Sequence, residues 1–531
     1  MPNRQRDELF QLIKSLGKGE KRNFKLYAQR SGQGADLKTI VLFDALERMS
    51  EYDEAALLEK NKRISKLQLS NLKAALYKQV LSSLRQIKEE DNVDLRLHEL
   101  MDHARILYNK GLYLQSLKLL EKHKALARQY HQVTYMQQAI FFEKKIEAMY
   151  ITRSMEHRAD ALAEESDEVQ RRIKVANDLS NLSLQLYAWY IRHGHARNKA
   201  EADDVRAFFQ EHLPTEKIKD NWFYCRLYLY QSQCWLAFIC HDFLSYYKST
   251  QRWVDLFHTE PQMLSVETIQ YIKGMHNLLG AHYDLKNRKP FFETLAVFEA
   301  FYHSPLVQGN DNFRIQTFVY LYISKLNKHF FTGEFSSGLY MVPEIENHLE
   351  EYALYMDRHR VLVFYYKIAC LYFGSGKNET AIDYLNKIIH LKVDLRTDLQ
   401  CYARLLHLIA HFELGTTDIL PYLAKSVYRF MAKMENLSHV EEAMFKFLRT
   451  NFNTPVKKMK PKLEKLLGQI KPFEKRTAEA RAFAYLDVIS WLESKIKGVP
   501  VEQVIREKFL AEEGRVKRQQ ALVNETTTLP K

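Results

Sequence analysis

Apolar residues recur every three to four positions through most of this 531-residue chain, and this spacing limits the possible folds more than any other feature. The runs at 106–120 and 368–389 are clear examples, and neither sustains a two-residue alternation. Spacing of three and four places apolar side chains on one face of an α-helix. Gly and Pro, which interrupt helices, number only 17 and 12. The chain is therefore predicted to be all-α, with long helices.

Short turn sequences separate the periodic runs, and small residues recur at a regular distance. The turn sequences are Asn109-Lys110-Gly111, Gly194-His195, Asp311-Asn312, Gly333-Glu334, Gly374-Ser375-Gly376 and Gly415-Thr416. Small residues that would let helices approach closely are Ala104, Ala148, Ala188, Ala237, Gly280, Ser324, Ala369 and Ala410, which are 40 to 49 residues apart. A period of this length with two helices per unit predicts an α-solenoid.

One stretch resembles a known repeat. In Leu362–Ile389, Tyr365, Ile368, Ala369 and Tyr372 occupy first-helix positions of a tetratricopeptide repeat, Gly376 its turn, and Ala381, Leu385 and Ile388 its second helix. The stretches from Leu97 and at Leu279-Gly280 match in part. The spacing exceeds the family's 34 residues, Ser116 replaces an alanine, and Val393 replaces a closing proline. Over about residues 95–450 the chain resembles divergent tetratricopeptide-like (TPR-like) proteins of bacterial type and uncharacterised role.

The resemblance implies an α-solenoid of antiparallel helical hairpins in a right-handed superhelix, with non-repeat caps. Residues 1–92 form the first cap or a small helical domain, with helices predicted at Asp7–Leu16, Lys21–Ala28, Leu37–Met49, Asp53–Asn61 and Ser65–Lys88. Residues 93–455 form the repeat array. Residues 456–513 form a basic cap with helices at Lys460–Ile470 and Phe473–Ile496, and residues 514–531 form a flexible tail.

A partner-binding groove is also implied by the resemblance, because the first helix of each hairpin lines the concave face in this family. The groove residues that it implies are Met101, Arg105, Tyr108, Asn109, Asn277, Asp284, Tyr366, Cys370 and Phe373. Aromatic and Arg side chains are common interface anchors. The alternative, in which Tyr366 and Phe373 are core residues, needs a register difference of only one position.

The net charge of +13 indicates a second candidate site, because residues 1–90 and 457–476 each carry a net charge of +6. The basic surface of the second region comprises Lys457, Lys458, Lys460, Lys462, Lys465, Lys471, Lys475 and Arg476. Such regions attract acidic proteins or phosphate backbones. The alternative function is therefore a nucleic-acid-associated or transcription-linked protein. Leu37–Lys88 has the helix lengths of a helix-turn-helix module, with Ser65–Arg85 as its reading helix.

Motifs for catalysis, cofactors and metals give no positive indication. Gly374-Ser375-Gly376-Lys377 and Gly17-Lys18-Gly19 lack the strand and the spacing of a phosphate loop. His407 and His411 share a helix face, but no third metal ligand lies nearby in the sequence. An enzyme would need scattered residues that spacing does not reveal. We predict no enzymatic activity, no cofactor and no metal.

Cysteine usage and hydropathy predict the compartment. The five cysteines lack Cys-x-x-Cys spacing, and neither a signal-peptide pattern nor a membrane-spanning run is found. We expect a cytoplasmic protein without a membrane anchor. The predicted function is an adaptor or scaffold that holds another protein or peptide in its groove, and the sequence identifies neither that partner nor the oligomeric state.

Overall fold

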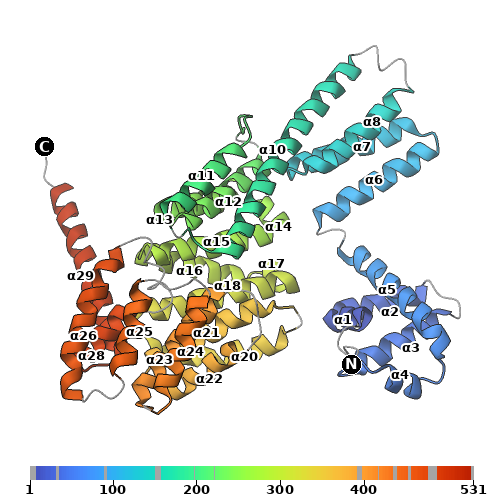
Figure 1. Ribbon diagram of the computed structural model, residues 1–531. Helices are drawn as coiled ribbons and strands as arrows, with labels where there is room; N and C mark the ends of the chain where they lie inside the picture. Colours follow the sequence, from blue (N-terminus) through green and yellow to red (C-terminus); the bar gives the residue numbers. More distant parts are fainter. Residues whose placement is uncertain are drawn as a thin grey trace. The chain divides into compact units, whose positions relative to one another are not determined.

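The computed structural model describes residues 7–30, 35–88, 92–149, 157–196, 198–219, 222–353, 355–390, 397–416, 418–433, 439–451, 456–475 and 487–527. Throughout these ranges the regular elements are helices and no strand occurs, which confirms the all-α prediction (Figure 1). The chain divides into two compact units, Met1–Ile173 and Lys174–Lys531. The division falls within helix α10 (Arg158–His193). No helix in the described ranges has the length and apolar character needed to cross a membrane.

The first unit begins with five helices that agree with the predicted ones to within a few residues. They are α1 (Glu8–Ser15), α2 (Lys18–Arg30), α3 (Ala35–Arg48), α4 (Glu54–Lys60) and α5 (Lys66–Lys88). Asp7 and Asp53 cap α1 and α4 by accepting hydrogen bonds from backbone N–H groups. Phe24, Phe43 and Leu76 are fully buried in their shared core. Residues 31–34, between α2 and α3, lie outside the described residues.

The remainder of the first unit contains α6 (Val93–Asn109), α7 (Tyr113–Gln129), α8 (Val133–Glu147) and the beginning of α10. A buried ion-pair network joins α7, α8 and α10. Lys124 Nζ lies 2.6 Å from Glu143 Oε2 and 3.2 Å from Glu165 Oε2, and Arg158 also pairs with Glu143. Because Lys124 and Glu143 are 2% and 1% exposed, this network replaces apolar packing at the centre of the helices.

The second unit contains helices paired through short turns, from the end of α10 to the last described helix. Its first part comprises α11 (Lys199–Glu211), α12 (Phe223–Ile239), α13 (Phe243–Thr259), α14 (Met263–Val266), α15 (Thr268–Asp284), α16 (Arg288–Tyr302), α17 (Pro305–Gln308), α18 (Asp311–Thr332), α19 (Phe335–Gly338), η1 (Leu339–Met341) and α20 (Val342–Glu351). Its second part comprises α21 (Arg358–Gly374), α22 (Asn378–Ile389), α23 (Thr397–Leu414), α24 (Leu420–Lys433), α25 (His439–Asn451), α26 (Val456–Ile470), η2 (Lys471–Lys475), α28 (Val488–Lys497) and α29 (Val501–Thr527).

The same type of turn follows the first helix of several of these helix pairs. After α21, Gly376 has a φ of +80° and the next N–H, of Lys377, donates to Tyr372 O at 2.9 Å. This is the bond that satisfies a free carbonyl at a helix C-terminus. After α12 and α15 the left-handed position is filled by His241 and Lys286, each with a φ of 57°. Left-handed residues at 241, 286, 333, 376 and 415 therefore recur at intervals of 39 to 47 residues.

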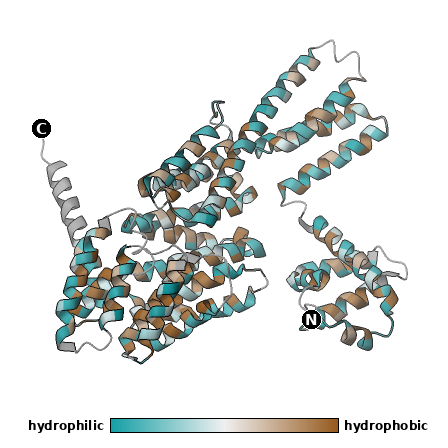
Figure 2. Cartoon of the chain, viewed as in Figure 1, coloured by the Kyte–Doolittle hydropathy of each residue, from teal (hydrophilic) through white to brown (hydrophobic). Residues whose placement is uncertain are grey.

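Apolar faces of the helices meet in the interior of each unit, and Figure 2 shows hydrophobic and hydrophilic residues sharing most helices. Small residues lie where first helices pack closely: Ala237, Ser324, Ala369 and Ala410 are all buried. Ala148, which was assigned to the same series, is exposed at the end of α8. Ala188 and Gly280 are half-buried, so the predicted series of small residues marks buried positions only in part.

The carboxyl-terminal part differs in detail from the prediction. The single helix expected at 473–496 corresponds to η2 and α28, and residues 476–486 lie outside the described ranges. Helix α29 continues to Thr527, although residues 514–531 were predicted to be a flexible tail. The stretch 515–523 lacks Gly and Pro and is rich in good helix formers, which explains why the backbone stays helical.

Candidate functional site: an inner polar face of the second unit

Polar side chains of α15, α18 and α21 contact one another directly, and we call this set the inner polar face. It comprises His276 and Asp284 of α15, Gln316, Tyr320 and Asn327 of α18, and Arg360, Lys367 and Cys370 of α21. The contacts join residues 40 or 44 positions apart, as Asn327 with Lys367 and Gln316 with Arg360 do. Successive first helices are therefore joined by hydrogen bonds as well as by apolar packing.

Arg360 is held in a fixed position by α18. Its Nη1 donates to Gln316 Oε1 at 2.5 Å and its Nη2 donates to Tyr320 OH at 3.0 Å. The guanidinium also lies 5.0 Å from the centroid of the Tyr320 ring, a cation–π distance. That ring stacks on His276 with centroids 4.3 Å apart. Gln316 and Tyr320 are neutral at pH 7. His276 is neutral as well, because burial lowers its pKa to about 3.

Lys367 lies two helical turns after Arg360 and has the same kind of environment. Its Nζ donates to Asn327 Oδ1 at 2.6 Å and lies 5.4 Å from the centroid of the Phe330 ring. Burial lowers its pKa to about 8, although Cys370 and Asp284 act in the opposite direction. Among the described residues, neither Lys367 nor Arg360 forms an ion pair with a carboxylate. Among the described residues the two cations thus have only neutral side-chain acceptors, so their charge is not compensated by a carboxylate in direct contact.

Asp284 is the acidic residue of this face. Its side chain is exposed to solvent, yet surrounding protein desolvates it and raises its pKa to about 7, against the opposing effect of Lys367. Desolvation also raises the pKa of Cys370 to about 12, so its thiol is protonated at neutral pH. Cys370 is therefore not an activated nucleophile.

The groove residues inferred from the sequence fall into two groups in the second unit. Asp284 and Cys370 belong to the inner polar face, and Asn277 lies on the same helix as Asp284, where its Oδ1 accepts from Tyr246 OH at 3.1 Å. Tyr366 and Phe373 are 3% and 6% exposed, so their predicted exposure is wrong. They lie on the sides of α21 that pack into the core, as a register difference of one residue would require.

The four groove residues inferred in the first unit lie on α6. Arg105 and Asn109 are exposed, and Tyr108 is half-buried beside Phe142, with ring centroids 5.4 Å apart. Met101 is 4% exposed and belongs to the core, so its predicted exposure is also wrong. These residues have no counterpart of the cation cluster found in the second unit.

Sequence reasoning missed Arg360, Lys367, His276 and Tyr320. The groove positions were taken from the repeat resemblance, and that resemblance did not select these four residues. A usable signal existed, because Lys367 is the only charged residue between Arg360 and Lys377. A lone cation in an apolar helix indicates either a buried ion pair or a ligand contact.

The predicted basic surface lies on α26 and η2. Lys458, Lys460, Lys462, Lys465 and Lys471 are exposed, opposite the buried residues Leu463, Leu466 and Ile470. Lys462 Nζ donates to Asn451 Oδ1 at 2.7 Å, and Lys471 Nζ lies 3.5 Å from Glu493 Oε1. The side chains of Lys457 and Lys475, and all of Arg476, lie outside the described residues. This is the charged outer face of an amphipathic helix.

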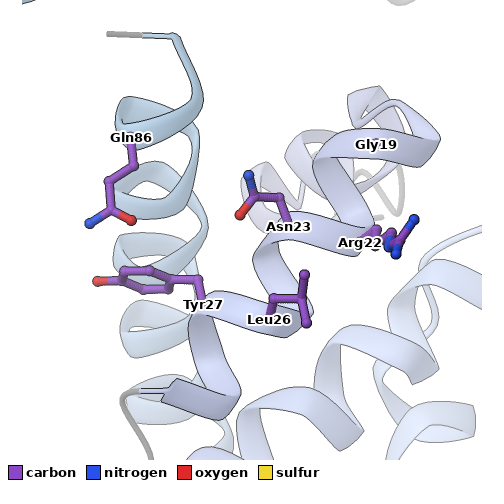
Figure 3. A pocket seen from close by; sticks show the side chains of 6 residues that line it. All are labelled: Gly19, Arg22, Asn23, Leu26, Tyr27 and Gln86. Carbon is purple, nitrogen blue, oxygen red and sulfur yellow. The ribbon is translucent and has the colours of Figure 1, made fainter.

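A shallow pocket of about 420 Å³ lies in the first unit between α2 and α5 (Figure 3). It is lined by Gly19, Arg22, Asn23, Leu26, Tyr27 and Gln86. Figure 3 shows Asn23 and Tyr27 directed toward the α5 side and Arg22 directed away from it. The pocket therefore brings only one charged residue to its rim, and its polar groups do not converge on a common point.

The histidine pair noted for its spacing lies on α23. The ring centroids of His407 and His411 are 4.5 Å apart, and burial lowers the pKa of His407 to about 4. In the part of the chain that the structure describes, no group of three or more His, Cys, Asp or Glu side chains is placed to share a metal ion.

Comparison of the chain with models of protein families, with curated proteins and with solved structures found no match. The inner polar face must therefore be interpreted from its own geometry.

Proposed function

We propose that this chain is a cytoplasmic adaptor built as a TPR-like α-solenoid, and that its second unit holds a segment of a protein partner against the inner polar face. The proposal is supported by the recurrence of paired helices and of their closing turns at intervals of 39 to 47 residues. Repeat arrays of this kind offer extended surfaces on which several units contribute side chains to one partner.

The observation that carries the proposal is the state of Arg360 and Lys367. Both cations are held by side chains of the neighbouring helix α18, at 2.5 Å and 2.6 Å, and every one of these acceptors is neutral. A purely structural role would favour carboxylate partners, as Lys124 has in the first unit. Preorganised cations that are partly exposed to solvent are instead suited to a ligand that arrives from outside.

The alternative function, association with nucleic acid, is favoured by α26. Among the described residues, Lys458, Lys460 and Lys465 are exposed and form no ion pair. Each phosphate that such lysines neutralise would make binding more sensitive to salt. The described lysines form the outer face of an amphipathic helix, however, so we expect this surface to contribute to solubility rather than to a specific complex.

Affinity capture of the tagged chain from its own cells, with and without nuclease, tests the proposal. We expect a stoichiometric protein that survives nuclease and is lost from the Arg360→Met/Lys367→Met variant. The matched control is Lys458→Met/Lys460→Met, which should retain the partner. Retention that disappears with nuclease, or that depends on the α26 lysines alone, would establish the nucleic-acid alternative instead.

A further inference from the structure

We infer that helix α5 docks an acidic amphipathic helix of a partner protein along an exposed apolar seam. The α5 seam comprises Leu67, Ser70, Ala74, Tyr77 and Leu81, and all five residues are exposed. It belongs to the first unit, whereas the residues of the proposed function lie in the second unit. Docking on α5 therefore does not depend on the inner polar face.

Helix α5 carries apolar residues on two faces. One face, with Leu76 and Val80, is buried in the core of the first five helices. On the other face, Leu67, Tyr77 and Leu81 are 94%, 37% and 44% exposed. A surface helix of a globular protein normally has one apolar stripe, which packs on the core, and polar residues opposite it. Single exposed apolar residues need no explanation, whereas a row of them on one face marks an interaction surface.

The spacing of the α5 seam is that of a helix-packing surface. Its residues follow one another at intervals of three, four, three and four positions, so at about 100° per residue they fall within an arc of about 80°. This is the spacing of a coiled-coil seam, along which a second helix packs. From Leu67 to Leu81 the seam extends about 21 Å along the axis. The small side chains of Ser70 and Ala74 let a second helix axis approach closely. The seam thus fits a helix of about 15 residues.

The charges of α5 determine which helix fits. Residues 66–88 contain five basic residues and no acidic one, the basic residues being Lys66, Lys73, Lys78, Arg85 and Lys88. Lys66 and Lys78 flank the seam on its two sides, and both are exposed. Neither forms an ion pair with another described residue. Residues that flank a coiled-coil seam select the partner through opposite charges. The matching helix therefore carries Asp or Glu beside its own apolar seam.

Two other occupants match the α5 seam less well. A second copy of the chain would bring Lys66, Lys78 and Arg85 close to the same cations of its own α5, and like charges oppose association. A nucleic-acid backbone would attract these cations, but phosphates offer no apolar surface to Leu67 and Leu81. An acidic amphipathic helix matches both the seam and its flanks.

Fluorescence anisotropy of the full-length chain with two labelled three-heptad peptides tests this inference. Both peptides have Leu at the seam positions, and the flanking positions are Glu in one peptide and Lys in the other. We expect the Glu peptide to bind, and the Lys peptide to bind at least about tenfold more weakly because its charges match those of α5. Leu67→Gln/Leu81→Gln should weaken binding of the Glu peptide by at least about tenfold, since it removes apolar contact area. Leu114→Gln/Leu244→Gln is the matched control, because these leucines are 53% and 55% exposed elsewhere, and it should leave binding unchanged.

A charge-reversal variant separates specific docking from misfolding. Lys66→Glu/Lys78→Glu should invert the preference, so that the Lys peptide binds more tightly than the Glu peptide. The same charge change on α26, Lys458→Glu/Lys460→Glu, should leave the preference as it is. Loss of structure cannot produce a gain of binding for the Lys peptide.

Four results would each overturn the assignment of an acidic helix to α5. They are absent or equal binding of the two peptides, undiminished binding by Leu67→Gln/Leu81→Gln, tighter binding of a labelled DNA duplex that Lys66→Glu/Lys78→Glu abolishes, and a dimer in analytical ultracentrifugation that Leu67→Gln/Leu81→Gln dissociates. The third result would assign the surface to nucleic acid and the fourth to a second copy of the chain. None of these measurements involves Arg360 or Lys367, so the proposed function is tested separately.

Discussion

Lys367 should react with amine-directed reagents at a pH that protects ordinary lysines. Burial lowers its pKa to about 8. At pH 7.5 about a quarter of an amine with that pKa is neutral, against roughly one part in a thousand for the usual lysine pKa near 10.4. Only the neutral amine is a nucleophile, so the reactive fraction of Lys367 should be on the order of 200-fold larger, before its reduced solvent access is considered.

Trace acetylation at a series of pH values, followed by mass spectrometry of the peptides, measures this reactivity residue by residue. Labelling of Lys367 should rise through a midpoint near pH 8, with exposed Lys458 of α26 as the internal comparison. In Asp284→Asn the midpoint should fall, because the Asp284 carboxylate raises the pKa of Lys367. A midpoint above pH 10, or one that Asp284→Asn leaves in place, would refute the described environment of this lysine.

Three further predictions concern stability, and denaturant unfolding measures each of them. Gly374→Ala should destabilise the second unit by about 1–3 kcal/mol, because the new Cβ would lie 2.1 Å from Phe335 Cδ1; an unchanged midpoint would contradict that packing. Gly468→Ala, the matched control in α26 with nothing within 4 Å of its Cβ, should stabilise by about 0.5–1 kcal/mol. Lys124→Met should cost about 3 kcal/mol in the first unit, because it removes a buried partner of Glu143; an unchanged stability would contradict the buried ion pair.

Helix positions were predictable because they depend on local sequence. The helices predicted in residues 1–92 match α1 to α5 to within a few residues, since apolar spacing acts within one or two turns. The turns after α6, α21 and α23 were predictable from Gly111, Gly376 and Gly415. The turns after α12 and α15 contain His241 and Lys286 in the same left-handed conformation, so no glycine marks them.

The candidate site was predictable only in part, because it depends on the register between helices. Asp284 and Cys370 were assigned to a groove from the repeat resemblance, and the structure places both on the inner polar face. Tyr366 was assigned to the same groove but is buried, because a change of one position on α21 rotates a side chain by about 100°. The contact of Arg360 with α18 joins residues 44 positions apart, and no local pattern determines such a pairing.

The most direct test of the account is a lysine footprint of the chain with its captured partner. The same acetylation experiment, repeated on the complex, reports which amines the partner covers. The account predicts that Lys367 becomes protected while Lys458, Lys460 and Lys465 keep their reactivity. Protection of the α26 lysines with Lys367 unchanged would contradict the assignment of partner binding to the inner polar face.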